Sequence, residues 1–164
     1  MTNVSDGARA ELAELLERLV AAGETVAVAE SLTGGLVCST LVTVPGASRV
    51  VVGGIVAYQT DVKASVLGVS AELLAERGAV DPDVALAMAR AVRTKFGATI
   101  GISTTGVAGP DPQDGVPVGT VFVAIANDLD ETVTRCDFEG SRDDIRTLAV
   151  GAALMLLENS LRTE

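Results

Sequence analysis

The chain has 164 residues, of which 48% are hydrophobic, and its 12 basic and 22 acidic side chains give a formal charge of −10. This length suits one domain over residues 1–164, the apolar content excludes a disordered chain, and the acidic balance argues against binding to nucleic acid or anionic membranes. No apolar run reaches the roughly 18 residues of a membrane span and no signal-peptide pattern opens the chain, so we expect a cytoplasmic location.

Apolar residues recur with periods that divide the chain into short helices and strands. Helical spacing predicts helices at residues 5–22, 36–43, 60–67, 70–77, 82–96 and 141–161. Runs of β-branched and apolar residues predict strands at residues 25–29, 50–58, 98–104, 118–126 and 131–138. The clearest helix starts are Asp81 followed by Pro82, and Ser141 with Asp144 three residues later, which approximates a capping box.

The order of these elements indicates the fold class. Helices separate the first three strands, and parallel strands need such crossover connections. The last two strands flank Asn127 and Asp128, which is typical of an antiparallel hairpin. We therefore expect a single-domain α/β protein, a three-layer α/β/α sandwich with a mixed, mostly parallel sheet. Cys38 and Cys136 lie far apart in the sequence, and we expect both to be reduced core residues.

The loop after the first predicted strand combines hydroxyl groups with glycines, in the order Glu30-Ser31-Leu32-Thr33-Gly34-Gly35. In open α/β sheets, ligands bind beyond the carboxyl ends of the strands. The positive end of the helix that follows would favour an alkoxide on Ser31. The alternative is that Ser31 or Thr33 only caps this helix. No lysine follows the glycines, so the loop is not a P-loop.

A second loop of this kind follows the strand at residues 98–104 and reads Thr105-Gly106-Val107-Ala108-Gly109-Pro110. Its residues are also ordinary turn residues, so a purely structural turn is the alternative. Two such loops after two strands make a shared ligand pocket more credible than either loop alone.

The chain contains no histidine, which excludes a Ser-His-Asp arrangement within it. Lys63 is a chemically sensible base for a serine, because burial lowers the pKa of an amine; a structural role is the alternative. Tyr58 either stacks on an aromatic ligand or covers the core. Arg142 and Arg146 share one helix face, where they bind an anion or pair with neighbours such as Asp143.

Five motifs together resemble a known family. They are Ala29-Glu30-Ser31-Leu32-Thr33-Gly34-Gly35, Gly54-Ile55-Val56-Ala57-Tyr58 with Lys63, Gly106-Val107-Ala108-Gly109-Pro110, Pro117-Val118-Gly119-Thr120, and Gly140-Ser141-Arg142 with Arg146. On these motifs, which span about residues 11–161, the sequence resembles the C-terminal domain of the CinA (competence-damage-inducible) family in its stand-alone form.

The resemblance implies a nicotinamide-nucleotide amidase. Such a protein hydrolyses the carboxamide of nicotinamide mononucleotide to nicotinic acid mononucleotide and ammonia, in the recycling of pyridine nucleotides. The resemblance also implies that no metal or organic cofactor is needed and that the chain forms a homo-oligomer. Two alternatives remain: a non-catalytic nucleotide-binding or regulatory module with the same pocket, and a scaffold domain whose glycine loops are only structural.

Residue by residue, the resemblance makes Ser31 the nucleophile, Lys63 the base and proton shuttle, and Tyr58 a wall for the pyridine ring. It places Thr105 and Gly106 in the pocket and Arg146, alone or with Arg142, on the phosphate or ribose. The remaining expected substrate contacts are Glu30 near the cationic ring, Thr33 and Gly109 in the loops, and Gly34 and Gly35, with N–H groups near these two glycines on the oxyanion.

Overall fold

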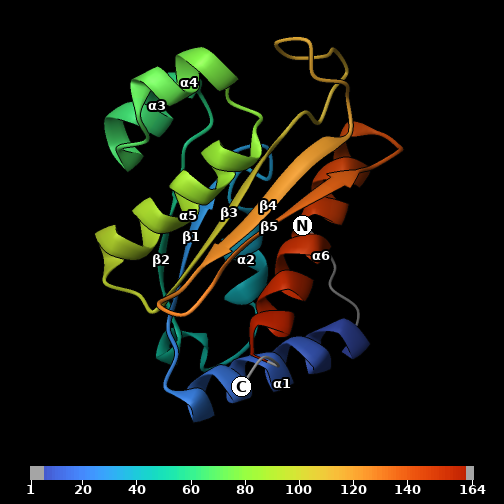
Figure 1. Ribbon diagram of the computed structural model, residues 1–164. Coiled ribbons are helices and arrows are strands. Elements are labelled where there is room, and N and C mark those ends of the chain that lie inside the picture. Colours follow the sequence, from blue (N-terminus) through green and yellow to red (C-terminus); the bar gives the residue numbers. More distant parts are fainter. Residues whose placement is uncertain (1–5, 162–164) are drawn as a thin grey trace.

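The computed structural model describes residues 6–161 and has helices on both faces of one five-stranded sheet (Figure 1). The helices are α1 (Asp6–Ala22), α2 (Leu36–Leu41), the 3-10 turn η1 (Ala47–Arg49), α3 (Thr60–Val62), the π-helical turn η2 (Lys63–Leu67), α4 (Ala71–Arg77), α5 (Pro82–Phe96) and α6 (Arg142–Ser160). The strands are β1 (Val26–Glu30), β2 (Val51–Val56), β3 (Ile100–Gly106), β4 (Thr120–Ala126) and β5 (Glu131–Asp137).

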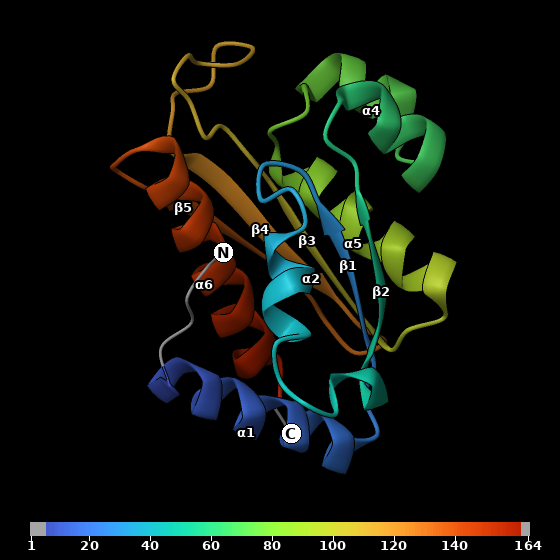
Figure 2. The ribbon, with the colours of Figure 1, turned by 180° about the vertical axis from the view of Figure 1, so that it is seen from behind.

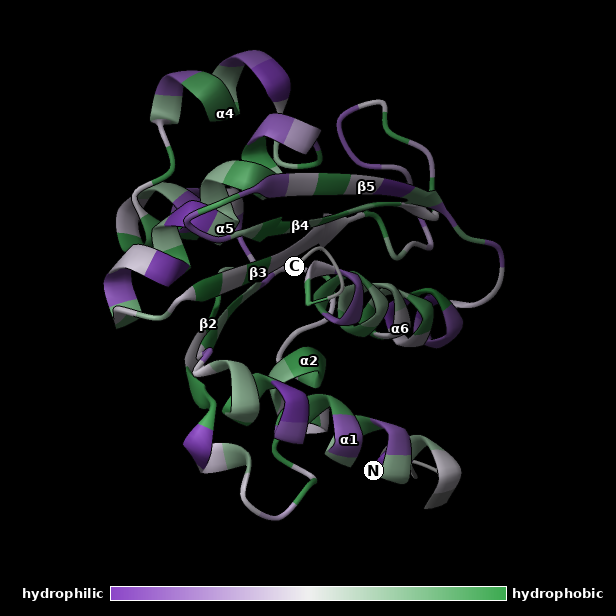
Figure 3. Ribbon diagram, turned by 60° about the horizontal axis from the view of Figure 1, so that its bottom comes forward, coloured by the Kyte–Doolittle hydropathy of each residue, from purple (hydrophilic) through white to green (hydrophobic). Residues whose placement is uncertain are grey.

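The sheet has the strand order β2-β1-β3-β4-β5. Strand β1 pairs in parallel with β2 and β3, while β4 is antiparallel to both β3 and β5. Helix α5 covers one face, and α1, α2 and α6 lie on the other (Figures 1 and 2). The expected three-layer sandwich with a mixed sheet is therefore confirmed. Strand β5 is an edge strand, and most of its residues are polar (Figure 3).

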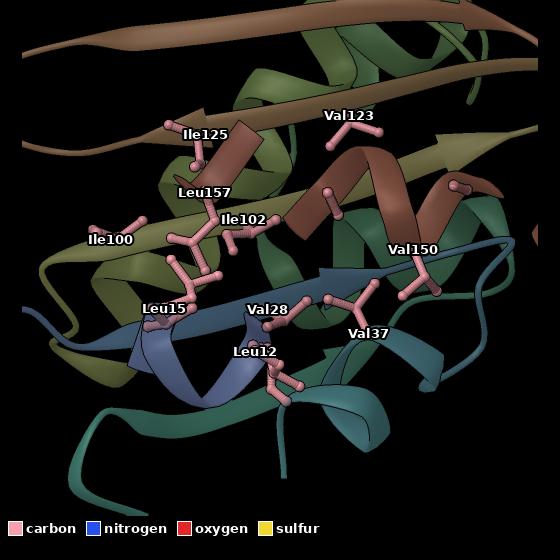
Figure 4. Close-up of a cluster of buried hydrophobic side chains, with 14 of the residues drawn as sticks. Leu12, Leu15, Val28, Val37, Ile100, Ile102, Val123, Ile125, Val150 and Leu157 are labelled. Carbon is pink, nitrogen blue, oxygen red and sulfur yellow. The ribbon is translucent and has the colours of Figure 1, made fainter. Parts of the chain in front are cut away.

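Alternate residues of the interior strand β1 face the two helical layers. Val26 and Val28 pack in the cluster formed with α1, α2 and α6, and part of this cluster is shown in Figure 4. Ala27 and Ala29 face α5 instead and lie in one cluster with Met88 of that helix. Because alanines line this face of the sheet, α5 can approach it closely. Burial on both faces accounts for the continuous apolar run in the sequence of β1.

Helix boundaries agree best with the sequence where a cap defines them. Helix α5 has the predicted bounds, with the Asp81 carboxylate accepting the N–H of Asp83 at 2.8 Å. The capping box of α6 is also present, between Ser141 and Asp144. The predicted helix at residues 60–67 is different: it is one turn of α-helix followed by the wider π turn η2.

Cys38 and Cys136 are free and partly buried, as predicted from the sequence. No helix within residues 6–161 is both long and apolar enough to cross a membrane.

Helix α5 lies so close to β3 that one glycine position tolerates no side chain. A Cβ atom on Gly101 would lie 2.0 Å from the carbonyl oxygen of Ala89. We expect Gly101→Ala to lower the free energy of unfolding by about 1–3 kcal/mol, because α5 must move away from the sheet. The control is Gly151→Ala at an exposed position of α6, where a Cβ meets nothing within 4 Å. It should stabilise the protein by about 0.5–1 kcal/mol. Urea denaturation measures both, and equal effects would contradict the close contact.

Candidate active site

The carboxyl ends of β1, β2 and β3 lie side by side, and the loops that follow them meet there (Figure 2). The hydrogen bonds between strands continue one residue beyond the strand ends. The N–H of Ser31 donates to the carbonyl of Thr104 at 3.0 Å, and the N–H of Ala57 donates to the carbonyl of Glu30 at 2.8 Å. The backbone of the Ser31 loop is therefore anchored to both neighbouring strands.

The structure brings Ser31 and Lys63 together. The Nζ atom of Lys63 lies 2.9 Å from Ser31 Oγ and donates to the carbonyl of Ala57, also at 2.9 Å. Lys63 is 1% exposed and Ser31 is 7% exposed, so bulk water reaches the pair only from the side of Ser31. The two side chains come from loops that follow adjacent strands, which explains how residues 32 positions apart in the sequence make contact.

The local backbone directs Lys63 into the interior. Helix α3 makes a single turn after β2, and the chain then widens into η2, which begins at Lys63. The N–H of Val69 closes this turn on the carbonyl of Lys63 at 2.9 Å, and Gly68 ends it in a left-handed conformation with φ 83°. Such π turns within helices are found often at functional sites.

Burial lowers the pKa of Lys63 from its ordinary value of 10.5 to about 8. Both hydrogen-bond partners of Nζ are neutral oxygens, so no carboxylate counteracts the loss of hydration. At neutral pH a fraction on the order of one tenth of the molecules therefore carries the uncharged amine. This amine can accept the proton of Ser31 Oγ.

The first loop limits which of its N–H groups are free to meet an oxyanion. The N–H of Gly34 donates to the carbonyl of Ser31 at 3.0 Å, and the N–H of Gly35 donates to the Glu30 carboxylate at 2.9 Å. Both groups are already used inside the loop, so they are not available to an oxyanion. In contrast, the N–H groups of Leu32 and Thr33 donate no hydrogen bond to any residue in the described range.

A hollow of about 120 Å³ lies beside the Ser31 loop. Its lining includes four residues expected at the site, together with others that sequence reasoning did not select; the full set is Leu32, Tyr58, Gly106, Val107, Ala108, Gly109, Asp111, Gln113 and Arg142. Tyr58 is 54% exposed, and its hydroxyl accepts a hydrogen bond from Arg142 at 2.5 Å. Arg142 also donates to the carbonyl of Gly109 at 2.6 Å, so its guanidinium joins two walls of the hollow.

Three other expected residues make contacts inside the protein. The Thr105 hydroxyl donates to the carbonyl of Ala79 at 2.6 Å and does not line the hollow. The hydroxyl groups of Thr33 and Thr104 lie 2.7 Å apart, and both residues are buried. Arg146 donates to the carbonyls of Leu32 and Thr33 at 3.0 and 3.1 Å. Arg146 therefore connects α6 to the Ser31 loop.

Some residues that shape the site could not be identified from sequence patterns. The carbonyl of Ala57 is a backbone group, and no side-chain motif could have indicated it. Thr104 was signalled only by its place in the hydroxyl-rich end of β3.

A larger hollow, of about 540 Å³, lies at the opposite end of the sheet, next to the end of α6. It is lined by residues such as Glu24, Ile125, Asp128 and Leu156. None of the residues that line it is among the buried polar or charged side chains in the described range. The buried pair of Ser31 and Lys63, together with the smaller hollow, therefore marks the carboxyl end of the sheet as the candidate site.

These features define an α/β sandwich protein with a buried serine–lysine pair at the carboxyl edge of its sheet. Residues 9–161 match the CinA C-terminal domain, and the chain belongs to this family. It is 53% identical over 148 residues to a CinA-like protein of Frankia casuarinae, a match that covers 90% of this chain and 34% of that protein. The chain thus spans about a third of the length of the curated relatives that it matches.

Solved structures of related proteins share the whole fold. A CinA superfamily protein from Klebsiella pneumoniae has a TM-score of 0.89 at 31% sequence identity, with 94% of this chain and 98% of that chain covered. One from Escherichia coli has a TM-score of 0.88 at 30% identity, covering 96% and 94%. The family membership inferred from the five motifs is confirmed.

Burial of the Lys63 amine makes the stability of the fold depend on pH. Between pH 8 and 10.5 the unfolded chain binds a proton at Lys63 that the folded chain lacks, so the contribution of Lys63 to stability rises with pH, by about 3 kcal/mol. We expect Lys63→Met to be most favourable relative to wild type near pH 7 and to lose this advantage by pH 10.5.

Urea denaturation of both proteins at several pH values measures the difference. The comparison with wild type is needed because Cys38 adds its own pH dependence. Mainly burial, and also the charge of Glu30, raises the pKa of the Cys38 thiol to about 12. This lowers the stability of both proteins alike above pH 9. A difference that stays constant from pH 7 to 10.5 would contradict a lowered pKa for Lys63.

Proposed function

We propose that this chain hydrolyses the carboxamide of nicotinamide mononucleotide, with Ser31 as nucleophile and Lys63 as base. The observation that carries the proposal is the 2.9 Å contact between Ser31 Oγ and a buried Nζ whose pKa is about 8. The resemblance to CinA-family amidases supplies the substrate. The mechanism uses no metal ion and no organic cofactor.

In the first step, Ser31 Oγ attacks the amide carbon while its proton passes to the uncharged amine of Lys63. The carbonyl of Ala57 accepts one amine hydrogen, which orients the lone pair toward Ser31. The carbonyl oxygen of the substrate becomes an oxyanion, for which the N–H groups of Leu32 and Thr33 are the donors we assign. One such donor is worth roughly 3–4 kcal/mol of transition-state stabilisation.

In the second step, the Lys63 ammonium gives its proton to the leaving nitrogen, and the C–N bond breaks to release ammonia. Nicotinic acid mononucleotide remains as an ester on Ser31. Lys63, uncharged again, then takes a proton from a water molecule that attacks this ester. Breakage of the ester bond returns the proton to Ser31 and releases the product.

The hollow limits which part of the nucleotide can enter. Pockets that enclose whole drug-sized ligands have volumes of about 300–1,000 Å³, whereas this one has about 120 Å³. We infer that it receives the pyridine ring and its carboxamide, with Tyr58 as one wall. The ribose phosphate then lies outside, where the Arg142 guanidinium is the cation at the rim.

The decisive experiment measures ammonia release from nicotinamide mononucleotide by the purified protein with a chelator present. We expect Ser31→Ala and Lys63→Ala each to lower the rate at least about 1,000-fold, because nucleophile and base act as one unit. The matched control is Lys95→Ala, which removes the only other lysine of the chain, an exposed residue of α5, and should keep full activity.

Three outcomes would decide against this proposal. Full turnover in a folded Lys63→Ala protein removes the serine–lysine pair from the mechanism. Binding of the nucleotide in a calorimeter without any ammonia release indicates a non-catalytic binding module. Chelator-sensitive activity contradicts a mechanism without metal.

The rate should be proportional to the fraction of molecules in which the Lys63 amine is uncharged. Below pH 8 the uncharged fraction of an amine with a pKa of about 8 falls tenfold per pH unit, so we expect kcat/KM to rise with pH and to level off above about pH 8. Initial rates of ammonia release between pH 6.5 and 9 measure this profile. A rate that is flat, or that falls through this window, would show that an uncharged lysine is not the base.

A further inference from the structure

Two charged side chains are buried within residues 7–161, Glu30 and Lys63, and both belong to the Ser31 site. Glu30 is 1% exposed. Removing a carboxylate from water is unfavourable by several kcal/mol unless hydrogen bonds replace its hydration. The use of a buried carboxylate directly before Ser31 therefore calls for a physical reason.

The Glu30 carboxylate is fully engaged by the backbone of the loop that carries Ser31. One oxygen accepts the N–H groups of Gly35 and Val37 at 2.9 and 3.0 Å, and the other accepts that of Cys38 at 2.9 Å. The side chain thus closes a ring from the end of β1 to the start of α2, with Ser31 inside it. A neutral capping residue offers one acceptor oxygen, whereas both carboxylate oxygens are needed here.

The backbone of Glu30 fixes the other side of the same ring, since its carbonyl accepts the N–H of Ala57 at 2.8 Å. Ala57 in turn provides the carbonyl that holds Lys63. Glu30 therefore connects both members of the pair: its side chain sets the path of the Ser31 loop, and its main chain sets the position of the acceptor for Lys63. Both of its carboxylate oxygens already accept backbone N–H groups, so a direct contact with the substrate ring is not the role that its position favours.

We propose that Glu30 is a positioning residue for the nucleophile: its buried carboxylate holds the Ser31–Gly35 turn so that Ser31 Oγ lies in reach of Lys63 and the N–H groups of Leu32 and Thr33 stay unused by the loop. This proposal rests on the proposed function and deepens it. Misplacement of reacting groups by about 1 Å can lower a rate about 100-fold, so the effect should appear in kcat rather than in KM.

The test compares Glu30→Gln and Glu30→Ala with wild type in the ammonia assay. Glutamine keeps one oxygen for Gly35 and Val37 but turns an amide NH₂ toward the N–H of Cys38, whereas alanine removes all three acceptors. We expect kcat to fall about 10-fold and about 100-fold respectively, with KM within about twofold of wild type. The pH at which the rate levels off should stay near 8, because burial of Lys63, and not the charge of Glu30, lowers its pKa.

A second readout needs no nucleotide. A small sulfonyl fluoride labels an activated serine, and its rate of reaction with Ser31, measured by mass spectrometry, should fall in the same order as kcat. The matched control is Asp81→Ala, which removes the carboxylate that caps α5 by accepting the N–H of Asp83. It should lower the melting temperature and leave kcat and labelling unchanged, which separates a loss of stability from a loss of positioning.

The outcomes distinguish this proposal from the one on which it rests. Wild-type kcat and labelling in folded Glu30→Gln would overturn the positioning role and leave the amidase mechanism intact. A rise in KM with unchanged kcat would make Glu30 a substrate contact and would also overturn it. A wild-type protein that neither releases ammonia nor is labelled at Ser31 would overturn both. If Glu30→Ala does not fold, Glu30→Gln alone decides.

Discussion

The candidate site depends on keeping the amine of Lys63 in the interior without an ionic partner. Lys63 reaches this position because η2 widens the helix at its start, and the neutral oxygens of Ser31 and Ala57 then satisfy Nζ. Hydrophobic residues of the same size would be more favourable for the fold near neutral pH, since they avoid the loss of hydration. The arrangement therefore exchanges some stability for a lowered pKa, which is a common feature of functional sites.

The second buried charge of the site could have cancelled this effect. A carboxylate next to Lys63 would favour the ammonium form and hold its pKa high. Glu30 does not do so: the loss of hydration alone accounts for the lowered pKa of Lys63, and the carboxylate oxygens of Glu30 point to the N–H groups at the start of α2. The site thus contains two opposite buried charges that do not pair with each other. Backbone N–H groups satisfy the Glu30 carboxylate, whereas the Ser31 hydroxyl and the Ala57 carbonyl satisfy the Lys63 amine.

The sequence predicted the elements of the fold better than the direction of individual side chains. Caps such as Asp81 and Ser141 are local signals, so the starts of α5 and α6 follow from them directly. At the end of β3, hydroxyl residues stand in succession, and the strand period does not tell which of them faces the pocket. Thr104 faces Thr33, while Thr105 faces Ala79 on the other side of the sheet. The use of Gly34 and Gly35 within the loop could not be predicted either, because it depends on how far the Glu30 side chain reaches.

Helix α6 links the two loops that form the site. Arg146 donates to the carbonyls of the Ser31 loop, and Arg142, one turn earlier, joins Tyr58 to Gly109 in the second loop. The two arginines share one face of the helix but make different contacts. Arg146 stabilises the Ser31 loop, whereas the charge of Arg142 lies at the rim of the hollow. In a chain with a charge of −10, attraction of an anionic substrate must come from such a local cation, since the overall field opposes it. A shift at the start of α6 would therefore move the Ser31 loop and the charge of Arg142 together.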